Sequence, residues 1–173
     1  MSERQSDLPE PWLRGTLTEI DAVARGVLHA LQLAKEDATK WCAPLSEGQL
    51  NAQPGRLAPV AFHLRHIARS LDRLLTYAEG RQLSEAQVTA LKSELQPGAT
   101  STEVFAEFES ALEQSARRVM ALSHGDYSDR RFVGKKKLPT TLGGLLVHVA
   151  DHTQRHVGQA ITTAKIVSTA KPL

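Results

Sequence analysis

The segment LGGLLVHVADHTQRHVGQAITTAKIV, from Leu142 to Val167, decides the fold and the chemistry expected of this chain. It holds His148, His152 and His156, three of the seven histidines, at successive spacings of four. Four residues of an α-helix span about 40° more than one full turn, so the three rings form one slanting stripe. Neighbouring rings in such a stripe can share a metal ion.

The same segment has the apolar periodicity of an amphipathic helix. Its apolar residues are Leu145, Leu146, Val149, Ala150, Val157, Ala160, Ala164 and Val167. On a helical wheel the centre of this arc lies roughly 140° from His148, 100° from His152 and 60° from His156. The stripe is therefore expected along one edge of the core face, beside a cleft. Histidines four apart on a helix are a known zinc arrangement, but partly buried histidines hydrogen-bonded to their neighbours are an alternative interpretation.

The rest of the chain predicts more helices of the same kind. Apolar residues recur at three and four over 17–41, 59–79 and 101–122, and a shorter helix capped by Ser84 is expected over 84–95. No stretch alternates convincingly as a strand does, so the region that leads to Pro139 is expected to be a loop. We predict an all-α fold: a four-helix bundle of the up-down type, with a short extra helix between the second and third long helices.

Length and composition indicate one domain. The 173 residues divide into an irregular lead-in at 1–14, a helical domain at 15–167 and a tail at 168–173. No apolar run is long enough to span a membrane, and the N-terminus lacks the apolar core of a secretory signal. The single cysteine, Cys42, excludes an internal disulfide, so we expect a cytoplasmic protein. Because Cys42 ends an apolar helix, a buried structural thiol is favoured over a nucleophile.

The charge of the chain gives little reason to expect nucleic acid as a partner. The net charge is only +2, and the one basic cluster falls in the predicted loop, at 130–137. A solvated loop is the favoured interpretation, with a rim that steers anions as the alternative. Binding of RNA or DNA through this loop is a third and weaker hypothesis.

A second histidine pair lies on the predicted helix at 59–79. His63 and His66 are three residues apart, so they are neighbours on one side of that helix. The apolar arc places His63 nearer the core and His66 about 60° further out, which slightly favours His63 as the inward ligand. His29 has no partner at helical spacing, and His124 follows a predicted helix end. Five of the seven histidines thus fall on two helices that can face each other.

Three imidazoles from two helices would make a reactive metal centre. Neutral imidazole binds divalent zinc, nickel, copper and iron, and three such ligands leave one position of the ion open. The ion would then lower the pKa of a bound water or hold a bound thiol as a thiolate. Asp151 and Gln159 are candidates for contacts to a ligand or the substrate, and Arg155 for pairing an anionic substrate. A solvated acid, a surface amide and a surface arginine are the simpler interpretations.

Three segments resemble a known family. PVAFHLRHIARSLDRLLTYAEG, at 59–80, resembles the second helix of the DinB/YfiT-like superfamily. HVADHTQRHVGQAITT, at 148–163, resembles its last core helix, in which His-x-x-x-His is followed closely by Gly-Gln. LSEGQLNAQP, at 45–54, is similar to the connector between the first two helices. The resemblance covers nearly all of residues 15–167.

The resemblance implies a four-helix bundle, often dimeric, with a three-histidine site for a divalent metal. The family's first ligand precedes an aliphatic residue and alanine, which matches His66, and the other two match His152 and His156. His63 and His148 are then supporting or alternative ligands. Zinc or nickel is the expected ion, with manganese or iron as alternatives.

Two functions are compatible with that resemblance. Members include metal-dependent thiol transferases, a thiol-dependent isomerase and many proteins of unknown activity, so membership supports a metal more strongly than a reaction. The first hypothesis is an S-transferase or hydrolase that acts on a small-molecule substrate, with a low-molecular-weight thiol as co-substrate and a homodimer as the assembly. The second is a non-catalytic metal-binding or stress-associated module. Neither involves a membrane.

The sequence has no glycine-rich phosphate loop and no G-x-S-x-G motif, which argues against nucleotide-dependent chemistry and serine hydrolysis.

Overall fold

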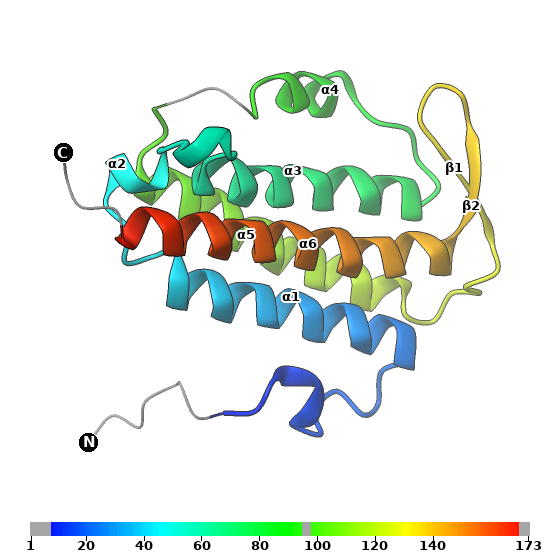
Figure 1. The fold of residues 1–173 in the computed structure, drawn as a ribbon. Coiled ribbons are helices and arrows are strands. Elements are labelled where there is room, and N and C mark those ends of the chain that lie inside the picture. Colours follow the sequence, from blue (N-terminus) through cyan, green and yellow to red (C-terminus); the bar gives the residue numbers. More distant parts are fainter. Residues whose placement is uncertain (1–7, 95–97, 170–173) are drawn as a thin grey trace.

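The computed structural model describes residues 8–94 and 98–169, and it is mostly helical (Figure 1). The long helices are α1 (Ala22–Trp41), α3 (Val60–Ala78), α5 (Ser101–Leu122) and α6 (Leu142–Thr169). The shorter elements are η1 (Pro11–Leu13), α2 (Glu47–Leu50), η2 (Pro54–Arg56), α4 (Glu85–Lys92), β1 (Arg130–Val133) and β2 (Leu138–Thr141). The predicted helical character and the short helix between the second and third long helices are confirmed.

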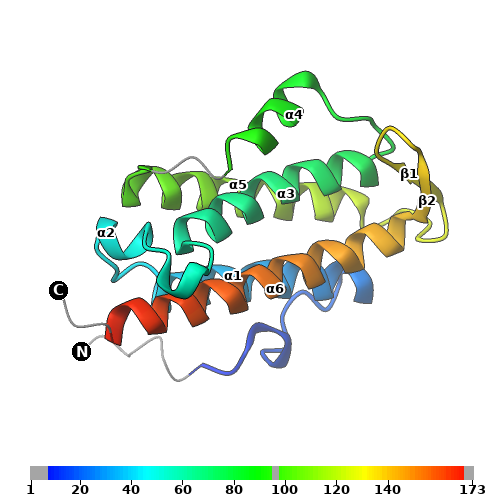
Figure 2. The ribbon, with the colours of Figure 1, turned by 45° about the horizontal axis from the view of Figure 1, so that its top comes forward.

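The four long helices lie side by side around one core. Helix α6 packs against α1 and α3, and α5 packs against the same two helices (Figures 1 and 2). The largest fully buried side chains are Phe108, Leu50, Leu64, Ile67, Leu71, Leu75, Leu142 and Leu146. Each such side chain contributes about 1.5–3 kcal/mol by leaving water. Within the described ranges, no helix combines the length and the apolar character that crossing a membrane requires.

Side-chain caps set where α1 and α6 begin. The Asp21 carboxylate accepts the Val23 N–H, so α1 begins at Ala22 rather than at Leu17, where the apolar periodicity starts. Leu17 itself has a φ of 56°, which breaks the helical path. In α6 the Thr141 hydroxyl accepts the Gly144 N–H at 3.0 Å. Thr141 therefore caps the start of α6.

The expected loop before α6 contains a β-hairpin, and the all-α prediction is wrong in this respect. Strands β1 and β2 pair antiparallel, from Arg130 opposite Thr141 to Val133 opposite Leu138. Each strand has only four residues and β2 contains a proline, so no alternating apolar pattern marks them. The Arg131 guanidinium donates to the Ala78 carbonyl at 2.6 Å and ties the hairpin to the end of α3. The hairpin thereby joins the end of α3 to the start of α6.

Helix α4 is held to the protein by polar contacts, because none of its residues is buried. The Gln87 amide donates to Asp72 and to Thr76, both at 2.8 Å. The helix ends at Lys92, earlier than predicted, and 95–97 lie outside the described residues. The expected lead-in at 1–14 includes the single turn η1, and 1–7 are not described. Helix α6 extends past the predicted domain end to 169, and 170–173 of the expected tail lie outside the description.

Candidate metal centre

Helices α3 and α6 bring four histidine rings into contact, because the two helices pack along their lengths. His66 Nε2 on α3 lies 3.3 Å from His152 Nε2 on α6. One turn away, His63 Nδ1 lies 3.1 Å from His156 Nδ1. The ring of His156 also lies 4.3 Å from that of His66 and 4.6 Å from that of His152, centroid to centroid. The prediction that the two histidine helices face each other is therefore confirmed.

Three of these rings, His66, His152 and His156, could hold one metal ion together. Each offers one ligand atom, and these atoms all lie within 4.8 Å of one another. Two nitrogens bound to zinc at about 2.0–2.1 Å in tetrahedral geometry lie about 3.3–3.4 Å apart. The Nε2 atoms of His66 and His152 have this separation. All three residues are half-buried, so the donor set and its spacing fit a divalent transition metal.

Three of the four clustered rings, those of His63, His152 and His156, are neutral at neutral pH. Burial, followed by the nearby charges of His156 and His66, lowers the pKa of His152 to about 4. Burial, followed by the charges of His66 and Arg155, lowers the pKa of His156 to about 4 as well. Burial also lowers the pKa of His63 to about 4. At neutral pH these rings have a free lone pair, which is the form that binds a metal.

Glu94 is the site residue that the sequence did not reveal. Its carboxylate is only 5% exposed, and Oε2 accepts the Nδ1–H of His66 at 2.6 Å. The other oxygen, Oε1, accepts from the Arg73 guanidinium at 2.6 Å. Burial raises the pKa of Glu94, but the hydrogen bonds from His66 and Arg73 outweigh it and hold this pKa below its usual value. Glu94 is therefore a carboxylate directly behind the His66 ring.

The two further histidines differ in their relation to the centre. His63 is buried beside His156, but it does not belong to the group of three converging ligand atoms. The helical wheel correctly placed His63 nearer the core, while the converging atom of α3 comes from His66, as the resemblance implied. The side chain of His148 is 46% exposed and its ring stands edge-on to His152 at 5.5 Å. His148 extends the stripe without joining the three ligand atoms.

The polar candidates on α6 lie on the outer surface. Asp151 is exposed and accepts a hydrogen bond from Arg155 at 2.6 Å. Gln159 is exposed too. None of these three residues belongs to the converging group among the described residues. The remaining histidines are separate: His29 is buried 3.2 Å from Thr16 Oγ1, and His124 is exposed just after α5.

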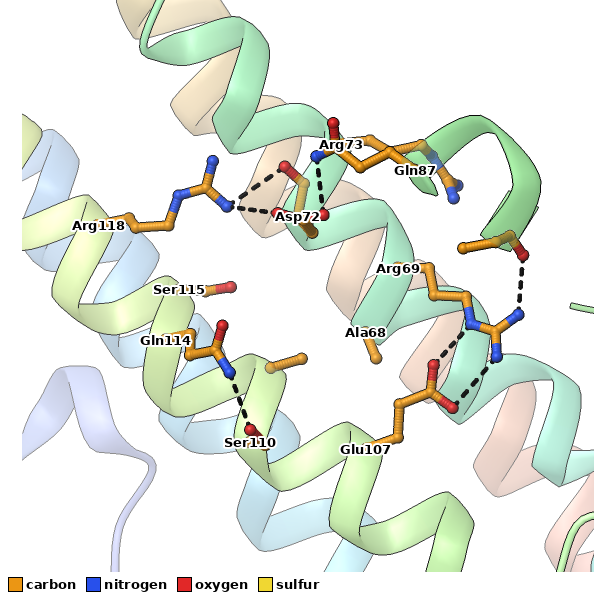
Figure 3. Close-up of a pocket in the computed structure, with 12 residues that line it drawn as sticks. Ala68, Arg69, Asp72, Arg73, Gln87, Glu107, Ser110, Gln114, Ser115 and Arg118 are labelled. Carbon is orange, nitrogen blue, oxygen red and sulfur yellow. Dashed lines mark hydrogen bonds and ion pairs between the residues drawn. The ribbon is translucent and has the colours of Figure 1, made fainter. Parts of the chain in front are cut away.

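A cavity of about 290 Å³ lies between α3, α4 and α5 (Figure 3). Three arginines line it, and each is paired: Arg69 with Glu107, Arg118 with Asp72, and Arg73 with Glu94. The three converging histidines do not line this cavity. Arg73 connects the two regions, because its guanidinium borders the cavity and binds the carboxylate that contacts His66.

Comparison with known proteins identifies the family. The family model of the DinB superfamily matches residues 30–160, from within α1 to within α6. No curated protein and no solved structure gives a significant match to the chain. The matched range includes α3, the part of α6 that holds its histidines, and all three converging ligands. This chain therefore belongs to the DinB superfamily.

Proposed function

We propose that this protein binds one divalent transition-metal ion through His66, His152 and His156 and acts with it on a small molecule. The observation that supports the proposal is the approach of three ligand atoms, from two separate helices, to within 4.8 Å of one another. Zinc or nickel is the preferred ion because all three donors are imidazoles, and manganese or iron is the alternative. The four long helices around one core support the further assignment to the four-helix bundles.

The proposed reaction is transfer of a low-molecular-weight thiol to an electrophile, or hydrolysis of a small substrate. A divalent ion with neutral ligands supplies a strong positive charge, which stabilises a thiolate or lowers the pKa of a bound water. His66, His152 and His156 would hold that charge at the α3–α6 contact. Arg155 lies exposed one residue before His156, where its guanidinium can attract an anionic substrate.

A non-catalytic metal-binding or stress-associated module is the second candidate function. One observation favours it: the cavity of about 290 Å³ lies between α3, α4 and α5, and the three histidines do not line it. A protein that only stores or senses an ion needs no substrate cavity beside its ligands. The two candidates therefore differ in whether the bound metal supports turnover.

The proposal also includes a small-molecule substrate, a cellular thiol, a homodimer and a cytoplasmic location. The homodimer is tested by light scattering, which measures the molar mass of the metal-loaded protein in solution. A monomer at micromolar concentration would remove this part of the proposal without affecting the metal centre.

Turnover of a model electrophile tests the catalytic proposal. The protein is loaded with zinc or nickel and assayed with 1-chloro-2,4-dinitrobenzene and glutathione, and for hydrolysis with a nitrophenyl ester. We expect turnover that requires metal, that is lost in His152→Ala and that is retained in His124→Ala. Full metal loading without turnover of either substrate would favour the non-catalytic module.

A further inference from the structure

We infer that Glu94 is a positioning residue of the metal centre, which fixes His66 in the tautomer whose Nε2 lone pair faces His152. Arg73 in turn holds the Glu94 carboxylate in place. The inference rests on the proposed metal function, but its structural part concerns the metal-free chain and is tested there separately.

The hydrogen bond between His66 and Glu94 determines the tautomer. His66 Nδ1 and Glu94 Oε2 lie 2.6 Å apart. A carboxylate can only accept a hydrogen bond, so the proton of the His66 ring must sit on Nδ1. A metal ion binds the neutral imidazole, which has one ring proton, so the lone pair that can bind it is on Nε2. That atom is the one that lies 3.3 Å from His152 Nε2.

The Glu94 side chain is held in this position by burial and by two hydrogen-bond partners. The side chain is 5% exposed, and each of its oxygens has a partner, His66 for Oε2 and Arg73 for Oε1. The Arg73 guanidinium also donates to Ser70 Oγ at 3.0 Å, and Ser70 Oγ lies 3.3 Å from His66 Nε2. The Arg73 guanidinium thus binds two of the hydrogen-bonding neighbours of the His66 ring, Glu94 and Ser70. A buried carboxylate with a single cationic clamp has little freedom to leave His66.

The arrangement is specific to one of the three ligands. Among the residues that the structure describes, no carboxylate lies within 4.0 Å of a ring nitrogen of His152 or His156. Phe62 stacks on the His66 ring with an interplanar angle of 22° and limits its rotation. His66 therefore has a fixed tautomer and a fixed ring plane. The Glu94 charge also makes the Nε2 lone pair more basic, so that it binds a metal ion more strongly.

Zinc affinity and ring tautomer, measured on Glu94→Gln, test the inference. The matched control is Glu107→Gln, because Glu107 on α5 pairs with Arg69 on α3, the helix that also holds Arg73 and His66. Within the described part of the chain, Glu107 makes no ion pair with a histidine. Loss of a partner of this kind weakens metal binding about 10–100-fold, so we expect that loss for Glu94→Gln in competition with a chromophoric chelator. For Glu107→Gln we expect a zinc affinity within about threefold of the wild type.

The tautomer is read from the ¹⁵N shifts of His66 in the metal-free protein at neutral pH. We expect the Nδ1–H form in the wild type and in Glu107→Gln, and a shift toward Nε2–H in Glu94→Gln. Glu94→Asp, whose shorter carboxylate is drawn back from the ring, provides the same comparison if Glu94→Gln does not fold. An Nε2–H tautomer in the wild type overturns the inference, as does a variant with unchanged tautomer and unchanged affinity. A wild type that has the Nδ1–H form but binds no zinc overturns the proposed function instead.

Discussion

His66 Nε2 on α3 and His152 Nε2 on α6 lie 3.3 Å apart, although 86 positions separate the two residues in the chain. This distance equals the edge of a zinc coordination tetrahedron with bonds of about 2.0–2.1 Å. His156 lies one turn further along α6, and its ligand atom lies within 4.8 Å of the other two. The packing of α3 against α6 therefore creates a three-nitrogen centre that neither helix contains alone.

His63 is predicted to be dispensable for metal binding although it is the more buried histidine of α3. We expect His63→Gln to bind zinc with an affinity within about tenfold of the wild type, because His63 lies outside the converging group. His66→Gln is the matched variant, three residues along the same helix, and should lose stoichiometric binding. Isothermal titration of both variants measures this. Retained binding in His66→Gln together with loss in His63→Gln would assign the ligand to His63.

Cys42 is predicted to be unreactive in the folded protein. It is 1% exposed, and burial, followed by the charge of Asp37, raises its pKa to about 12. At pH 8 an ordinary cysteine is about one-quarter thiolate, whereas a thiol of this pKa is about one ten-thousandth thiolate. We expect no reaction with Ellman's reagent in native protein and full reaction in guanidinium chloride. Rapid labelling of the native protein would show that Cys42 is accessible.

Glu79 is predicted to stabilise the fold in a pH-dependent way. Burial raises the pKa of Glu79, but hydrogen bonds from Arg118 and Arg81 lower it by a larger amount, so the folded pKa lies below the usual value. A depressed carboxyl pKa stabilises the fold above the unfolded pKa of about 4.3, and this is lost as the pH falls through the folded pKa. We expect Glu79→Gln to reduce the free energy of unfolding at pH 7 by about 0.5–1 kcal/mol, with the difference disappearing in acid.

Urea unfolding of wild type and Glu79→Gln from pH 7 to pH 3 measures this prediction. Glu113→Gln is the control, because the exposed Glu113 lies 3.7 Å from Lys35 and such surface pairs contribute little. A difference between wild type and Glu79→Gln that stays constant down to pH 3 would contradict the assigned role of the carboxylate.

Gly143 is predicted to be required for the junction between the hairpin and α6. A Cβ at this position would lie 3.0 Å from Tyr127 Cβ and 3.1 Å from Tyr127 O, which accepts the Gly143 N–H at 2.9 Å. We expect Gly143→Ala to cost about 1–3 kcal/mol of stability. Gly26→Ala, in α1 with no atom within 4 Å of the added Cβ, should instead stabilise by about 0.5–1 kcal/mol. Thermal unfolding of both variants measures the two changes in stability. Equal stability for both would contradict the predicted clash of the added Cβ with Tyr127.

The sequence predicted the long helices well because each has a sustained apolar period, as in the arc from Leu145 to Val167. The sequence-based prediction failed where a local or polar contact determines the structure. The start of α1 depends on the Asp21 cap rather than on apolar Leu17. The hairpin depends on the pairing of two four-residue strands and on a contact from Arg131 to the end of α3. None of these features has a periodicity that a wheel can detect.

The histidine stripe on α6 was visible in the sequence, but periodicity did not identify its partner on α3, which only the family resemblance indicated as His66. Periodicity reports how near a side chain lies to the core, and by that measure His63 is the better candidate. Convergence on a point depends on how the two helices are aligned along their lengths, which brings His66 opposite His152. Glu94 had no local signal at all, because it follows α4 and meets His66 across 28 positions.

Metal content, measured by mass spectrometry on purified protein reconstituted with zinc, tests the central claim most directly. The account predicts about one ion per chain in the wild type and in His29→Ala and His124→Ala. It predicts loss of the ion in each of His66→Ala, His152→Ala and His156→Ala. A full equivalent of zinc retained in any of these three variants, or none in the wild type, would contradict it.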